Sequence, residues 1–158
     1  MISKHERQKS SVFPTLIGSL LSLSSLSMDV RGDEYTRGIT AYESGDYSKA
    51  FELIKISAKS GAAKSQLILS TMYRRGIGIK KNEYEGFYWC KQAAEQEVLE
   101  AKFQLGIMYM EGEGVTENED DAIQWLWGAA DQGYPQAAEM LQYIFSEEFD
   151  IEASNIGC

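Results

Sequence analysis

The sequence repeats itself with a period of 36 residues, and this periodicity limits the folds that the chain can adopt. When residues 62–101 are aligned with residues 98–137, twelve of 40 positions are identical. Unrelated segments of this length share roughly two or three. The identities include Leu69/Leu105, Tyr73/Tyr109, Gly76/Gly112, Asn82/Asn118 and Trp89/Trp125. A shorter copy lies upstream, over residues 35–61. Repeats of this length are typical of arrays in which identical supersecondary units stack and bury a continuous core.

Apolar residues within each unit have the spacing of a helix. Leu69, Met72 and Tyr73 lie at i, i+3 and i+4 and therefore share one helix face. A Gly-x-Gly segment ends this helix, and Asn82 or Asn118 is suited to cap the next one. We predict helices at 33–44, 47–60, 63–75, 83–96, 99–111, 119–132 and 135–146. No stretch alternates with the period of a strand. The expected fold is all-α, an α/α solenoid of about three helix-turn-helix repeats with a C-terminal capping helix.

The third unit resembles a known family, the SEL-one-like repeat (SLR), which is related to the tetratricopeptide repeat. It contains Leu105-Gly-Ile-Met-Tyr-Met-Glu-Gly-Glu-Gly114, followed by Trp125, Ala129-Ala130 and Gln132-Gly133. Residues 66–101 are a second copy, in which the usual Leu-Gly is Leu69-Ser70 and the usual Ala is Gly86. Residues 35–61 look like a tetratricopeptide-type unit. The resemblance implies a protein-binding adaptor that is not an enzyme. Cysteine-rich bacterial members carry a disulfide in each repeat, and this chain lacks those paired cysteines.

The N-terminal segment has the pattern of a secretory signal peptide. Basic residues precede an apolar, serine-rich run that is shorter than the roughly 20 residues of a membrane span. Ser25 and Ser27 stand at the −3 and −1 positions of a cleavage site before Met28. We expect residues 1–27 to be a signal peptide, or alternatively a disordered tail or an uncleaved anchor. Residues 28–146 would form the solenoid and residues 147–158 a loose acidic tail. The expected location is the bacterial periplasm or the exterior, with the cytoplasm as the alternative.

Charge and composition argue against several functions. A net charge of −9 argues against a nucleic-acid groove, which needs clustered Lys and Arg. The only histidine is His5, and no Ser-x-x-Lys spacing occurs. We therefore expect no catalytic residue, no metal site and no cofactor, and a cell-envelope hydrolase is the least favoured function. Membrane contact would occur only through an uncleaved N-terminal segment.

Candidate partner-binding residues lie on the first helix of each predicted hairpin, because these helices line the concave face of such stacks. They occupy positions that the repeat does not fix, and their mixed aromatic, aliphatic and cationic character suits a peptide or helix of a partner protein. The candidates on these helices are Tyr35, Ile39, Tyr42, Thr71, Arg74, Arg75, Ile107, Met110 and Tyr143. For Arg74 and Arg75 there are two interpretations. They bind a carboxylate of the partner, or they form salt bridges to acids of the neighbouring repeat.

Aromatic residues that follow the period are predicted to be structural, namely Tyr73, Tyr109, Trp89 and Trp125. Trp127 is different, because the equivalent positions carry Lys55 and Lys91 and should face water. It is a candidate for a partner patch or a contact with another chain, unless the last repeat tilts and covers it. Cys90 corresponds to apolar residues in the other units, which predicts a buried thiol. The favoured function is an adaptor, and the alternative is a self-associating scaffold subunit, so the chain should be a monomer or associate weakly.

Overall fold

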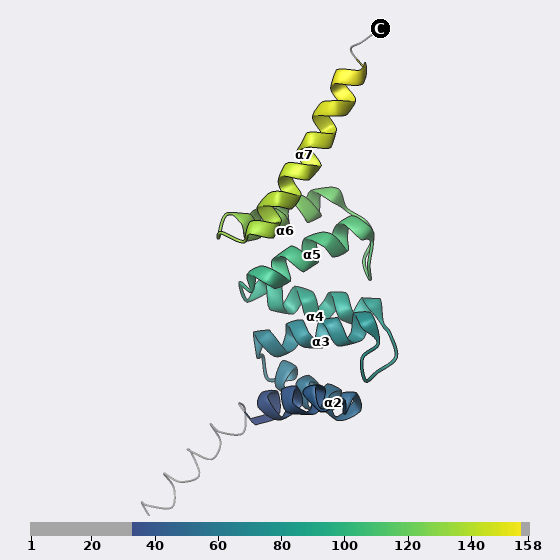
Figure 1. Ribbon diagram of the computed structural model, residues 1–158, viewed down its shortest axis with the longest axis vertical. Helices are drawn as coiled ribbons and strands as arrows, with labels where there is room; N and C mark the ends of the chain where they lie inside the picture. The colour runs from purple at the N-terminus through teal and green to yellow at the C-terminus, as the bar shows by residue number, and fades with distance from the viewer. Residues whose placement is uncertain (1–32, 156–158) are drawn as a thin grey trace, which may run out of the picture.

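The fold of residues 33–155, with side chains to residue 146, is described by a computed structural model. Within this range all regular elements are helices. A helix at 33–43 is followed by α2 (Tyr47–Lys59), α3 (Ala63–Arg75), α4 (Glu83–Glu95), α5 (Leu99–Glu111), α6 (Glu119–Ala130) and α7 (Pro135–Asn155). They stack as antiparallel pairs, one above another, up to α7 (Figure 1). The all-α solenoid predicted from the sequence is confirmed. The predicted signal peptide lies outside the described residues.

Each hairpin contains a first helix, here called the A helix, and a second, the B helix. The A helices are 33–43, α3 and α5, and the B helices are α2, α4 and α6. The helices α2 to α7 all start where the sequence pattern places them. The Asn82 and Asn118 side chains each accept a hydrogen bond of 3.2 Å from a backbone N–H of the following helix, as expected of N-caps.

The last helix is longer than predicted. α7 continues to Asn155, so the expectation of a loose tail is wrong for residues 147–155. The acidic composition of this segment suggested solvation, yet it contains neither glycine nor proline before Gly157, and nothing local interrupts the helix. The upper part of α7 extends beyond the stack (Figure 1).

The core repeats along with the sequence. Phe51 of α2 contacts Tyr73 of α3 edge to face, with ring centroids 5.3 Å apart and an interplanar angle of 89°. Phe87 of α4 and Tyr109 of α5 form the same contact with the same distance and angle. These pairs join each B helix to the A helix of the next hairpin, and such geometry adds about 0.5–1.5 kcal/mol beyond area burial. Trp89 and Trp125 also pack against the buried clusters, which confirms that the periodic aromatics are structural.

A small residue lies where the A and B helices of a hairpin cross. It is Gly38 in the first hairpin and Gly106 in the third, and a β-carbon on Gly106 would lie 2.8 Å from Leu126 Cγ. In the second hairpin the position is Ser70, and the facing residue of α4 is Gly86 instead of alanine. The Ser70 hydroxyl donates a 2.7 Å hydrogen bond to the Gly86 carbonyl. Serine replaces glycine on α3 and glycine replaces alanine on α4, so α3 and α4 can still pack closely at this point. In α7 the equivalent position is Gln142.

One turn between hairpins is held by side chains rather than by glycine. Glu97 has φ 66°, although Gly61 and Gly133 occupy this position in the other turns. Its carboxylate accepts hydrogen bonds from the buried Lys102 and, at 2.8 Å, from the Gln132 amide of the next turn. The hydrogen bond from Lys102 is the main reason that the pKa of Glu97 lies below its ordinary value. These bonds offset the backbone strain, which is of order 1–3 kcal/mol.

Candidate functional site

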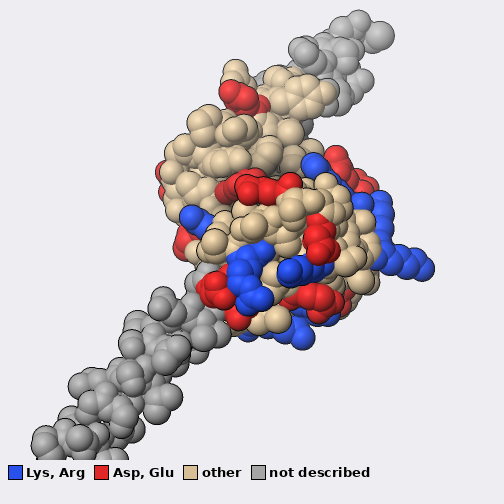
Figure 2. Space-filling view, turned by 60° about the horizontal axis from the view of Figure 1, so that its bottom comes forward, with Lys and Arg blue, Asp and Glu red and all other residues tan. Residues whose placement is uncertain are grey.

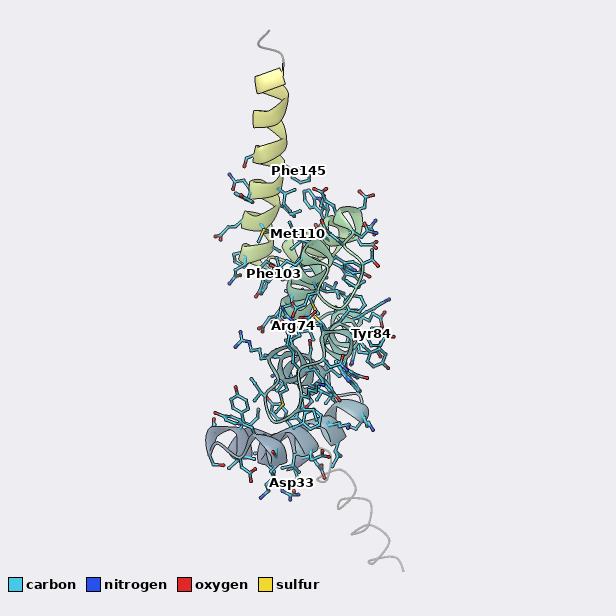
Figure 3. All side chains as sticks on the ribbon, turned by 90° about the vertical axis from the view of Figure 1, so that its right-hand side faces the viewer. Asp33, Arg74, Tyr84, Phe103, Met110 and Phe145 are labelled. Carbon is cyan, nitrogen blue, oxygen red and sulfur yellow. The ribbon has the colours of Figure 1, made fainter. Side chains whose placement is uncertain are left out.

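The candidate residues on the A helices form columns that run along the stack. Ile39, Thr71, Ile107 and Tyr143 occupy one column, and Tyr42, Arg74 and Met110 occupy another. From the second hairpin onward, successive members of a column are 36 residues apart, as Thr71 and Ile107 are. The first and second hairpins are offset by only 32 residues, as Ile39 and Thr71 are, because the loop within the first hairpin is shorter. Phe103 and Met110 lie on the side of the stack opposite Tyr84 (Figure 3). The repeat register gives the other members of each column equivalent positions on their own helices.

A hollow lies between α3 and α5. Its volume is about 350 Å³, and it is lined by Thr71, Arg74, Arg75, Glu100, Gln104 and Glu113. Three of the predicted residues therefore meet three polar residues of the following repeat that the sequence reasoning did not single out. This hollow is the candidate site.

Arg74 is held in place within the hollow by the neighbouring repeat. Its Nε donates a 3.0 Å hydrogen bond to Glu113 Oε2, its Nη2 pairs with the same oxygen, and its Nη1 donates to Gln104 Oε1 at 3.3 Å. Glu113 raises the pKa of the guanidinium, and burial, which is the larger single influence, opposes it. The second interpretation offered for Arg74, a salt bridge to the neighbouring repeat, is thus the one observed.

Gly86 makes this arrangement possible. A β-carbon on Gly86 would lie 2.4 Å from Arg74 Cγ, so alanine there would displace the arginine stem. Glycine thus replaces the usual alanine at the position where the Arg74 side chain passes over α4. This pairing of Gly86 with Arg74 is a signal in the sequence that could have indicated a packed arginine.

Arg75 differs from its neighbour. Its side chain is exposed and makes no ion pair with any of the residues from 33 to 146. Glu100 is also exposed and accepts a 3.3 Å hydrogen bond from the Gln104 amide. The lining of the hollow therefore includes an exposed guanidinium from α3 and an exposed carboxylate from α5, which suits the hydrogen-bonding groups of a polypeptide.

The apolar candidates are less open than expected. Tyr35 and Ile39 are half-buried against the cluster of α2 and α3, and Met110 packs against the cluster of α6 and α7. Each A helix uses part of its outward face to contact the following repeat. Tyr42 and Tyr143 stay exposed, while Thr71 and Ile107 are half-buried.

The residues singled out on the B helices lie as the repeat register predicted. Trp127 is 54% exposed, which agrees with its lysine equivalents and rules out the covered alternative. Cys90 is fully buried, its Sγ donates to the Ala101 carbonyl at 3.4 Å, and desolvation raises its pKa to about 12.

From residue 33 to residue 155, no cluster of three or more potential metal ligands occurs, and no helix is long and apolar enough to cross a bilayer.

Comparison with known proteins places the repeat in a family. The Sel1 repeat family model matches residues 31–61, 63–98 and 99–134, which coincide with the three hairpins. The chain belongs to the Sel1 repeat family. This Sel1-repeat chain matches no curated protein.

Solved structures share the fold of this Sel1-repeat chain. One is a protective antigen of uropathogenic Escherichia coli with an SLR fold, at 31% identity and TM-score 0.72, over 77% of this chain and 27% of that one. A Sel1 repeat protein from Oxalobacter formigenes is 31% identical with TM-score 0.66, over 70% of this chain and 45% of that one. Cysteine-rich protein B of Helicobacter pylori, at 21% identity, has TM-score 0.56 over 58% and 69% of the chains and shows the fold alone. This Sel1-repeat chain thus spans less than half the length of the first two.

Proposed function

We propose that this Sel1-repeat chain is an adaptor that binds a peptide or helix of a partner protein in the hollow between α3 and α5. The observation that carries the proposal is a hollow of about 350 Å³ whose lining includes the exposed Arg75 of α3 and the exposed Glu100 of α5. The family is one of helical-repeat scaffolds for protein–protein interaction, which supports this function class.

The arrangement gives the two arginines separate roles. The Arg74–Glu113 pair joins the second and third repeats and fixes the walls of the hollow. Arg75 supplies the group that binds a carboxylate of the partner, in line with the first interpretation offered from the sequence. Tyr42, Ile107 and Tyr143 extend the surface along the stack.

The test is site-specific photo-crosslinking in the native host. A photoreactive residue replaces Gln104 inside the hollow or Glu52, which is exposed on α2, as the control. Cross-linked partners identified by mass spectrometry should appear from Gln104 and should be lost in Arg75→Ala, whose Tm should not change. Equal cross-linking from the two positions, or undiminished cross-linking in Arg75→Ala, would contradict the proposal.

The proposal includes export, with residues 1–27 as the signal peptide. N-terminal sequencing of the mature protein is expected to begin near Met28, and an intact N-terminus in the cytoplasm would refute this part alone.

A self-associating subunit is the second candidate, favoured by the exposed Trp127. Sedimentation at two concentrations distinguishes it from a monomeric adaptor.

A further inference from the structure

Charge is distributed unevenly along the stack. Residues 33–81 contain nine Lys and Arg against five Asp and Glu, a net charge of +4, whereas residues 82–146 contain two against thirteen, a net of −11. Basic side chains gather over the part of the stack near the N-terminal helices (Figure 2). The part formed by α4 to α6 is therefore acidic and attracts cationic partners over several ångströms.

Two exposed tyrosine side chains lie on α4 within this acidic part, and the Tyr88 ring contacts the Trp89 ring edge to face with centroids 5.2 Å apart. Tyr84 is 70% exposed and Tyr88 is 47% exposed, and their spacing of four residues places them on one helix face. At the equivalent positions α2 has Ser48 and Glu52, and α6 has Asp120 and Gln124. The repeat therefore folds without aromatic rings at either position. Large exposed rings that packing does not require are typical of interaction surfaces.

The loop between α5 and α6 contacts the beginning of α4, toward which it reaches in Figure 1. A β-carbon on Gly114 of this loop would lie only 3.0 Å from the backbone nitrogen of Tyr84. The same loop carries the exposed Glu117, and α6 opens with the exposed Glu119. The nearby cations are the exposed Lys80 and Lys81 of the loop before α4, the latter paired with Glu83 at 2.6 Å, and the half-buried Lys91 of α4.

We propose that Tyr84 and Tyr88, together with Glu117 of the adjoining loop and Glu119 at the start of α6, form a docking surface for an arginine- and lysine-rich segment of a partner protein. The cationic side chains lie over the tyrosine rings, and the carboxylates compensate their charge. A second copy of this chain is disfavoured as a whole by its net charge of −9, and only its basic part, residues 33–81, could oppose the acidic part. Concentration-dependent dimers that are lost when Tyr84 and Tyr88 are replaced would identify that copy as the occupant and overturn the inference. The surface faces away from the hollow between α3 and α5, so this inference goes beyond the proposed function and is tested independently of it.

The test is fluorescence anisotropy of a dye-labelled peptide that alternates glycine with arginine and lysine. The matched peptide with glutamate at the charged positions is the control. The variant Tyr84→Ser/Tyr88→Gln introduces side chains that the other repeats carry at these positions, so the fold is kept, as circular dichroism will verify. Arg75→Ala, in the hollow, is the control variant.

We expect the basic peptide to bind more weakly as salt rises, and the glutamate peptide not to bind. The double variant should lose about five- to thirty-fold in affinity, which corresponds to about 1–2 kcal/mol for two ring–cation contacts. Arg75→Ala should bind the basic peptide like the wild type. Equal affinity of the double variant and the wild type, or no binding of the basic peptide at low salt, would overturn the inference. Neither result would bear on cross-linking from Gln104.

Discussion

Two glycines with the same backbone conformation provide a test of how the repeats are joined. Gly114 has φ +74° and Gly133 has φ +86°, so alanine at either position carries the strain of a left-handed residue, about 1–2 kcal/mol. Only their surroundings differ. A β-carbon on Gly114 would lie 2.1 Å from the Glu83 carbonyl oxygen, whereas no atom lies within 4 Å of one on Gly133.

The additional cost of Gly114→Ala follows from that contact. Since real β-carbons essentially never lie within 3.0 Å of another atom, the loop must move away from α4 by about 1 Å. Overpacking of this kind costs about 1–3 kcal/mol. We expect Gly133→Ala to lower the free energy of unfolding by about 1–2 kcal/mol, and Gly114→Ala to lower it by about 2–5 kcal/mol.

Urea denaturation of both variants, followed by far-ultraviolet circular dichroism, measures the difference. Gly78→Ala repeats the experiment at the preceding hairpin, where a β-carbon would lie 2.1 Å from the Tyr47 carbonyl oxygen. If Gly114→Ala and Gly78→Ala were no more destabilising than Gly133→Ala, the contact of each loop with the preceding B helix would be refuted.

Three further predictions concern buried or paired polar groups. Glu113→Gln leaves the half-buried Arg74 without its carboxylate and should lower the free energy of unfolding by about 1–3 kcal/mol in urea denaturation, and an unchanged value would contradict the pairing. Because the hydrogen bond from Lys102 holds the pKa of Glu97 below its ordinary value, the stabilisation from Glu97 is present above that ordinary value and is lost as the pH falls through the lowered pKa of the folded state. Tm should thus fall more steeply with acidification in the wild type than in Glu97→Gln, and parallel curves would refute this. Burial raises the pKa of Cys90 to about 12, so iodoacetamide should label Cys90 only after unfolding, as peptide mapping that separates it from Cys158 will show, and rapid labelling of Cys90 in the native chain would contradict its placement.

Most of the fold could be predicted from the sequence because its determinants are local. The spacing of Leu69, Met72 and Tyr73 and the caps Asn82 and Asn118 act within a turn or two of helix, and they fix where each helix lies. Comparing equivalent positions of the repeats also predicts which side chains are exposed, as it does for Trp127. The end of α7 is not predicted, because an acidic composition does not show whether a helix continues through a segment that has no glycine or proline.

The candidate site could be predicted only in part, because it depends on contacts between repeats. Thr71, Arg74 and Arg75 were found as variable positions on an A helix. That Arg74 is used internally depends on Glu113, which is 39 residues away, and on the space left by Gly86. Residues close in sequence indicate neither that Glu113 of the loop reaches Arg74 nor that Tyr35 and Met110 pack against the next repeat.

Gln142 determines what α7 can accept as a neighbour. A hairpin partner would have to cross α7 where Gly38 and Gly106 leave room for Ile54 and Leu126, and the glutamine side chain fills that space. Lengthening the array with another unit would therefore require Gln142→Gly along with the new helix. A single amide side chain at this crossing position thus disfavours a B helix packed against α7 in the way that α6 packs against α5.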